Sequence, residues 1–145
     1  MNESKYSWNH PIQLPLFRKE IVKVGIVGSR RRNSGIDKDI IFETVRKLKA
    51  LYGDYLVIVS GGCKKGADLF AKKACLEFDI KLVEHFPDLN GAKTYNQIVK
   101  RYYERNLIVA DDSDFVFAMV SSDRKGGTEN TIKHAKKLGK NVELI

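Results

Sequence analysis

The chain has 145 residues, which fits one domain, and 43% of them are hydrophobic, as expected for a globular core. No apolar run approaches the ~20 residues of a membrane span, and the first ten residues lack the apolar segment of a signal peptide. With 26 Lys and Arg against 18 Asp and Glu, the net charge of +8 favours phosphate-bearing partners, either nucleic acid or small nucleotides.

Residues 1–20 are predicted to form an arm outside the regular part of the chain. Pro11 and Pro15 cannot lie inside a regular helix. Apolar side chains such as Trp8 and Phe17 indicate packing on the same domain or on a second subunit. The arm and the final helix therefore offer surfaces for a homodimer.

From residue 21 to the end, strand and helix patterns alternate. The predicted strands are apolar, β-branched runs at 21–27, 55–59, 81–86, 114–120 and 142–145. The predicted helices have apolar residues at helical spacing and lie within 40–51, 67–78, 98–107 and 132–138. This alternation predicts an α/β fold, a single Rossmann-like three-layer domain over residues 21–145 with a mostly parallel five-stranded sheet.

The loops that follow the strands are the expected ligand site, because open α/β sheets bind ligands beyond the carboxyl ends of their strands. Three of these loops combine glycine or serine with adjacent cations and precede a helix. Helix amino ends attract anions, and glycine lets the backbone approach a phosphate closely. The cations of these loops are Arg30, Arg31, Arg32, Lys64, Lys65, Arg124 and Lys125. The pattern predicts a phosphate site.

Two standard phosphate motifs and a metal site are not supported. The segment 25–30 lacks the third glycine of a dinucleotide fingerprint, and 61–66 is not followed by the Lys-Ser/Thr pair of a P-loop. Asp111, Asp112 and Asp114 stand close together, but they precede a strand at its amino end and are interpreted as loop residues. We expect no metal and no cofactor, and two cysteines without paired C-x-x-C spacing indicate a reduced, cytoplasmic protein.

Four segments occur in an order and spacing that resemble the SLOG superfamily of LOG-, DprA- and YspA-like Rossmann-type proteins, with the small YspA-related branch most similar. They are Val27-Gly28-Ser29-Arg30, Val59-Ser60-Gly61-Gly62 with Lys65-Gly66-Ala67-Asp68, Arg105-Asn106, and Gly126-Gly127-Thr128. The resemblance covers residue 21 to the carboxyl terminus. It implies a pocket for a nucleotide or nucleotide derivative between the loops after the first and fourth strands.

The resemblance also implies which residues line that pocket. The phosphate- and ligand-binding residues would be Gly28, Ser29, Arg30, Ser60, Gly61, Gly62, Lys65, Gly66, Asp68, Arg105, Asn106, Gly126, Gly127 and Thr128. The leading hypothesis is a sensor or carrier that binds a nucleotide-derived small molecule.

Two alternatives remain open. The first is a nucleoside-monophosphate phosphoribohydrolase, with Asp68 and Glu129 as candidate catalytic carboxylates, although Thr131 stands where LOG-type enzymes carry their glutamate. The second is DprA-like binding of single-stranded DNA. It ranks lower because DprA-type proteins continue Arg-Asn with arginine, whereas this chain has Leu107, and because bases need stacking platforms. Tyrosines 95, 102 and 103 offer such platforms, but tyrosines on a helix more often pack against the sheet.

Overall fold

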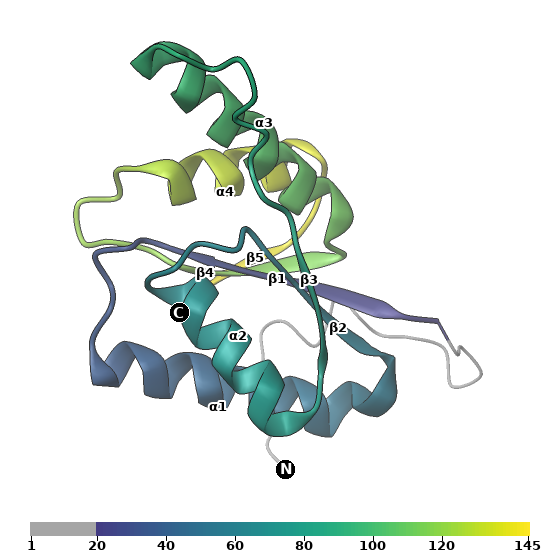
Figure 1. The fold of residues 1–145 in the computed structure, drawn as a ribbon. Coiled ribbons are helices and arrows are strands. Elements are labelled where there is room, and N and C mark those ends of the chain that lie inside the picture. The colour runs from purple at the N-terminus through teal and green to yellow at the C-terminus, as the bar shows by residue number, and fades with distance from the viewer. Residues whose placement is uncertain (1–19) are drawn as a thin grey trace.

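Parallel strands alternate with α-helices throughout residues 20–145, the part of the chain that the computed structural model describes (Figure 1). The strands are β1 (Val22–Gly28), β2 (Leu56–Ser60), β3 (Lys81–Glu84), β4 (Phe115–Met119) and β5 (Val142–Leu144). The helices are α1 (Gly35–Tyr52), α2 (Ala67–Phe78), α3 (Tyr95–Asp112) and α4 (Gly127–Lys137), with a 3₁₀ turn η3 (Gly53–Tyr55) before β2. The arm predicted at residues 1–20 lies almost wholly outside the described residues.

The five strands are in the order β3-β2-β1-β4-β5, and every pair is parallel. From β1 the chain adds β2 and then β3 on one side, and it then crosses to the other side of β1 to add β4 and β5. The strand order therefore reverses between β1 and β4, where Gly28 pairs with Met119. Helices α1 and α2 cover one face of the sheet and α3 and α4 cover the other (Figure 1). The predicted three-layer α/β fold with five strands is confirmed, and the sheet is wholly parallel.

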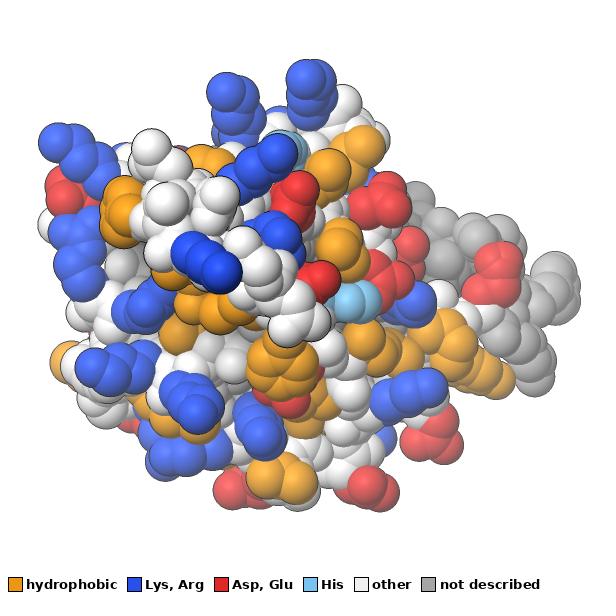
Figure 2. Space-filling model, turned by 45° about the horizontal axis from the view of Figure 1, so that its top comes forward, with side chains coloured by type: hydrophobic (Ala, Val, Ile, Leu, Met, Phe, Trp, Pro, Cys, Tyr) orange, Lys and Arg blue, Asp and Glu red, His pale blue; other side chains and the backbone are white. Residues whose placement is uncertain are grey.

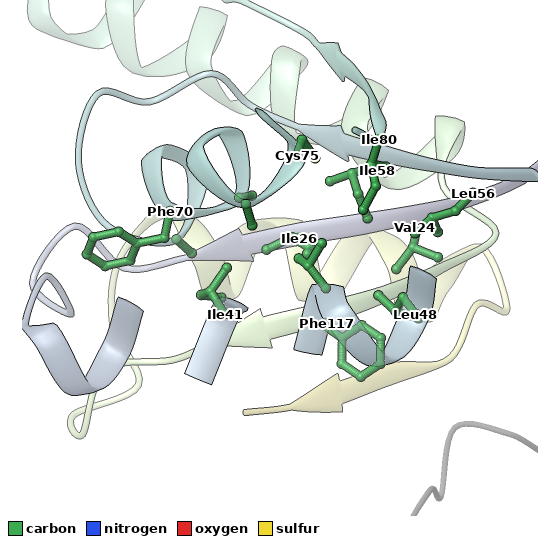
Figure 3. Close-up of a cluster of buried hydrophobic side chains, with 14 of the residues drawn as sticks. Val24, Ile26, Ile41, Leu48, Leu56, Ile58, Phe70, Cys75, Ile80 and Phe117 are labelled. Atoms are coloured by element: carbon green, nitrogen blue, oxygen red, sulfur yellow. The ribbon is translucent and has the colours of Figure 1, made fainter. Parts of the chain in front are cut away.

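The larger part of the core lies between the sheet and the α1–α2 layer. Ile26, Ile58 and Phe117 point from neighbouring strands toward Ile41 and Leu48 of α1 (Figure 3), and all five side chains are buried. Burial of branched side chains on both faces explains why the strands appear in the sequence as nearly continuous apolar runs. A smaller cluster packs α3 and α4 on the opposite face.

Glycine at the end of β1 allows close packing where the strand, β4 and α2 meet. A Cβ atom on Gly28 would lie 2.6 Å from Cβ of Ala67 and 2.9 Å from Cβ of Met119. These distances are well inside van der Waals contact. Gly28 therefore brings the start of α2 against the point where strand order reverses.

Two helices extend beyond the ranges expected from their apolar spacing. Helix α1 begins after Ser34, whose hydroxyl accepts from the Asp37 amide while the Asp37 carboxylate accepts from the Ser34 amide. Helix α3 continues through Asp112, so Asp111 and Asp112 belong to its last turn; their interpretation as loop residues was wrong. Among the described residues, no helix is long and apolar enough to cross a membrane.

Candidate functional site

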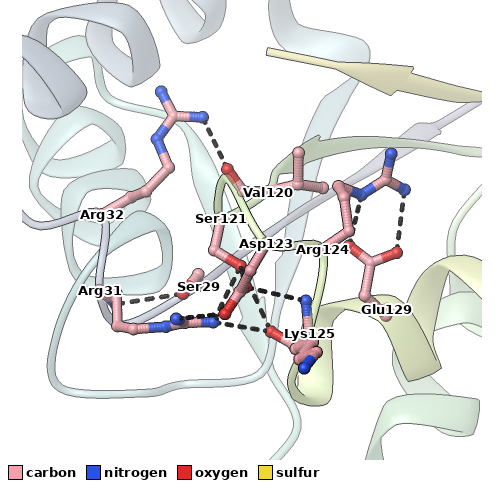
Figure 4. Close-up of polar contacts among 9 residues, drawn as sticks. All are labelled: Ser29, Arg31, Arg32, Val120, Ser121, Asp123, Arg124, Lys125 and Glu129. Carbon is pink, nitrogen blue, oxygen red and sulfur yellow. Dashed lines mark hydrogen bonds and ion pairs between the residues drawn. The ribbon is translucent and has the colours of Figure 1, made fainter.

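The loops after β1 and β4 are joined at the carboxyl edge of the sheet by Arg31. Its guanidinium donates to both carboxylate oxygens of Asp123, at 2.8 and 2.7 Å (Figure 4). It also donates to the Ser121 hydroxyl and the Lys125 carbonyl, each at 3.0 Å. One side chain thus connects two loops that are about ninety residues apart in sequence.

The loop after β2 packs directly against the loop after β1. Gly66 has a φ of +69°, and a Cβ atom there would lie 2.8 Å from the Ser29 carbonyl oxygen. The Gly66 amide also donates to Oδ1 of Asn33 at 2.8 Å. Glycine is required at this position both by the backbone conformation and by the close approach of the two loops.

Helix α3 connects the remaining parts of the edge through Arg105 and Asn106. Nη1 of Arg105 donates to the Gly61 carbonyl and, at 3.4 Å, to the His85 carbonyl, so it contacts the loops after β2 and β3. Nε of Arg105 donates to Oδ1 of Asn106 at 3.0 Å, and the Asn106 amide donates to the Gly127 carbonyl at 3.3 Å. The loops after β2, β3 and β4 therefore meet around these two side chains.

Some backbone donors of the site are used within the protein. The Ser29 amide donates to the Met119 carbonyl, the Gly62 amide to Oγ of Ser60, and the Cys63 amide to Oδ2 of Asp68. These bonds fix the shapes of the first two loops. The amides involved are consequently not free to bind a ligand.

Other donors at the same edge have no hydrogen-bond partner among residues 20–145. We call them the open donors: the amides of Arg30, Gly126, Gly127 and Thr128, and Nη2 of Arg105. The last two amides belong to the first turn of α4, where helix geometry leaves amides unpaired. The open donors thus come from three segments of the carboxyl edge, and the Arg105–Asn106–Gly127 hydrogen bonds link two of these segments, α3 and the start of α4.

The loop cations predicted from the sequence fall into two groups. Three arginines are held by carboxylates of this chain, namely Arg31 by Asp123, Arg32 by Asp37, and Arg124 by Glu129. Arg30, Lys64, Lys65 and Lys125 form no ion pair with the carboxylates of residues 20–145. Figure 2 shows lysine and arginine side chains spread over one face of the molecule, with fewer acidic side chains among them. The second group is available to an anion.

The two candidate catalytic carboxylates lie in different environments. Glu129 makes two hydrogen bonds to Arg124, at 2.7 and 2.9 Å (Figure 4). Asp68 is buried beneath Gly61, and burial raises its pKa to about 6, although the Cys63 amide and the charge of Arg105 oppose the rise. Burial likewise lowers the pKa of Arg105, and the Asp68 carboxylate opposes that effect.

A polar cluster that sequence reasoning missed ties the end of α3 to the sheet. Asp112 accepts from Nζ of Lys23 at 2.7 Å and lies 2.7 Å from Nε2 of His85. Partial burial raises the pKa of Asp112, but the hydrogen bonds from Lys23 and His85 outweigh it and the net shift is downward. Within the described part of the chain, no three His, Cys, Asp or Glu side chains are arranged to hold a metal.

One aromatic ring contacts the glycine pair of the second loop, and another contacts Arg105. Phe86 is 64% exposed, and its ring occupies the space where a Cβ atom of Gly62 would lie. The Tyr102 ring has the guanidinium carbon of Arg105 at 5.4 Å from its centre and that of Arg30 at 6.0 Å. Phe86 was not among the predicted site residues, because the sequence pattern puts it in the predicted strand 81–86, whereas β3 ends at Glu84.

No family model matches the chain, and no curated protein matches it. Among solved structures, it is similar to a molybdenum cofactor binding protein from Rippkaea orientalis, with a TM-score of 0.67 and 23% identity over 88% of this chain and 77% of the other. It is also similar to the molybdenum cofactor carrier protein of Chlamydomonas reinhardtii, with a TM-score of 0.65 and 21% identity over 86% and 76%.

A third similar structure is that of TM1055, with a TM-score of 0.60 and 21% identity over 84% of this chain and 72% of the other. At these identities the likeness is one of fold. The chain therefore shares the Rossmann-like architecture that the SLOG resemblance implies, while the YspA-related branch stays a prediction.

Proposed function

We propose that this protein binds a small phosphorylated molecule, a nucleotide derivative or a comparable cofactor, at the carboxyl edge of the sheet, as a carrier or sensor. The observation that carries the proposal is the set of open donors at the carboxyl edge of the sheet. A phosphate group has several acceptor oxygens and needs donors that the protein has not already used. Amides at a helix amino end and a guanidinium are the donors that suit it best.

The positions of the donors favour one ligand that touches several segments. The Gly126–Thr128 amides come from the start of α4 and the Arg30 amide from the loop after β1, while Nη2 belongs to Arg105 on α3. Asn106 holds the start of α4 beside Arg105. A polyanion bound there would be recognised by backbone and guanidinium together.

The solved structures that share this fold supply one further candidate ligand. Two of them are described as molybdenum cofactor binding or carrier proteins. The molybdenum cofactor is accordingly placed beside nucleotides as a ligand to test on this chain.

Binding without hydrolysis is the better-supported activity. A hydrolase needs a carboxylate that reaches the glycosidic bond, and Glu129 is engaged by Arg124. The pKa of Asp68 is raised to about 6, which suits a general acid. However, the residue is only 8% exposed, and its carboxylate accepts a hydrogen bond from the Cys63 amide. Release of free adenine from AMP would be the sign of that second activity.

Isothermal titration calorimetry of the full chain with AMP, ADP-ribose, cyclic AMP and, under anaerobic conditions, the molybdenum cofactor tests the proposal. At least one ligand is expected to bind, and Arg105→Ala is expected to weaken it about tenfold or more, since hydrogen bonds to charged groups contribute about 1.5–3 kcal/mol. Arg46→Ala is the matched control, because Arg46 pairs with Glu43 on the exposed side of α1. Equal effects of the two substitutions, or no binding by any ligand, would contradict the proposal.

A further inference from the structure

Resting on the proposed function, we infer that the site selects ligands that carry a planar heteroaromatic ring, and that Phe86 and Tyr102 are the residues that bind the ring. The starting observation is that consecutive glycines present two different surroundings. The missing Cβ of Gly61 faces Arg105 and Asp68, whereas that of Gly62 faces the Phe86 ring. The glycine pair therefore separates a polar side from an aromatic side.

Phe86 lies at the surface, where its ring can contact a ligand, and not in the hydrophobic core. Its ring packs on the Gly62 backbone, where the φ of +72° excludes most side chains, yet 64% of the residue stays exposed. One edge of the ring is fixed by the glycine while much of the remainder faces solvent. Such a ring is positioned in advance, so a ligand that stacks on it loses little conformational freedom.

Tyr102 provides a second ring next to Arg105, the residue that contacts Gly61. It is half-buried, and guanidinium groups approach it from α3 and from the loop after β1, at 5.4 and 6.0 Å. Arg30 makes no ion pair with a carboxylate of residues 20–145, and its guanidinium lies over the Tyr102 ring. The cation–π contact positions the Arg30 guanidinium at the carboxyl edge of the sheet and leaves its positive charge unpaired by any carboxylate of residues 20–145.

Phe86, the Gly61–Gly62 backbone, Arg105, Tyr102 and Arg30 thus form a continuous strip from the end of β3 to the loop after β1. Aromatic rings alternate with guanidinium groups along this strip, and the open amides of the start of α4 lie next to it, where Asn106 bonds both Arg105 and Gly127. Planar rings stack on aromatic side chains and on guanidinium planes. The strip and the open donors together match a ligand with a ring at one end and a phosphate at the other.

Calorimetry with two pairs of probes tests this inference. AMP and FMN carry ring and phosphate, whereas ribose 5-phosphate and inorganic phosphate lack the ring. We expect at least one ring-bearing probe to bind about tenfold or more tightly than ribose 5-phosphate, since stacking on an aromatic side chain contributes about 1–3 kcal/mol. Phe86→Leu and Tyr102→Leu should each remove most of that preference and leave ribose 5-phosphate binding unchanged.

Tyr55→Leu is the matched control, because Tyr55 is a partly exposed aromatic residue in η3, before the amino end of β2. It should leave the preference intact. Equal affinities for ring-bearing and ring-free probes, or a preference that survives both Phe86→Leu and Tyr102→Leu, would overturn the inference while the proposed phosphate site stands. Failure of all four probes to bind would contradict the phosphate site itself.

Discussion

Gly28→Ala is expected to lower the free energy of unfolding by about 1–3 kcal/mol, the range found when extra volume is forced into a packed core. The new methyl group would lie 2.6 Å from Cβ of Ala67 and 2.9 Å from Cβ of Met119. These atoms are attached directly to the backbone of α2 and β4, so no side-chain rotation relieves the contact. Urea denaturation followed by circular dichroism measures the loss.

Gly35→Ala is the matched control for that experiment, because it adds the same methyl group at the first residue of α1, where nothing lies within 4 Å of the new Cβ. It should be neutral or stabilising by up to about 1 kcal/mol, since alanine restricts the unfolded chain more than glycine does. Equal stabilities for the two variants would show that the junction of β1, β4 and α2 is not packed as described.

Asp68→Asn is expected to change how stability depends on pH. The folded pKa of Asp68 is about 6, above the ordinary 3.8, so the folded protein holds a proton there that the unfolded chain releases between about pH 4 and 6. The stability of the wild type should therefore fall across this window as pH rises. Asparagine does not ionise, and its carbonyl can still accept from the Cys63 amide.

The difference in unfolding free energy, wild type minus Asp68→Asn, should become more negative by up to about 3 kcal/mol between pH 4 and pH 7. Chemical denaturation of both proteins at each pH measures this difference, in which the titration of all other groups common to both proteins cancels. A difference that stays constant, or that grows more positive with pH, would show that Asp68 is not a buried carboxylate of raised pKa.

Much of the architecture was predictable because each element leaves a local pattern. The strands are buried on both faces and appear as apolar runs, and the helices between them keep an apolar spacing. The order of the strands leaves no such local pattern, because it depends on which face of the sheet each connecting helix covers. The amino ends of α1 and α3 were missed because the N-caps Ser34 and Thr94 start both helices ahead of their first apolar residues at helical spacing.

For the site, the sequence indicated the correct edge but not the state of its donors. Glycine-rich loops with cations were visible, yet Arg31 meets Asp123 only because β1 and β4 are neighbours in the sheet. Sequence gives no sign that three of the loop arginines are paired with carboxylates while Arg30 is not. The contact of Phe86 with Gly62 likewise depends on the pairing of β2 with β3.

The most direct test of the phosphate site is a titration of the isotopically labelled protein with AMP and inorganic phosphate, followed by amide resonances in NMR. The account predicts that the amides of Arg30, Gly126, Gly127 and Thr128 shift together with one dissociation constant for each probe. The amides of Gly53 and Gly139, at the carboxyl ends of α1 and α4, should not move. Unchanged resonances at the four open amides, or shifts centred elsewhere on the fold, would contradict it.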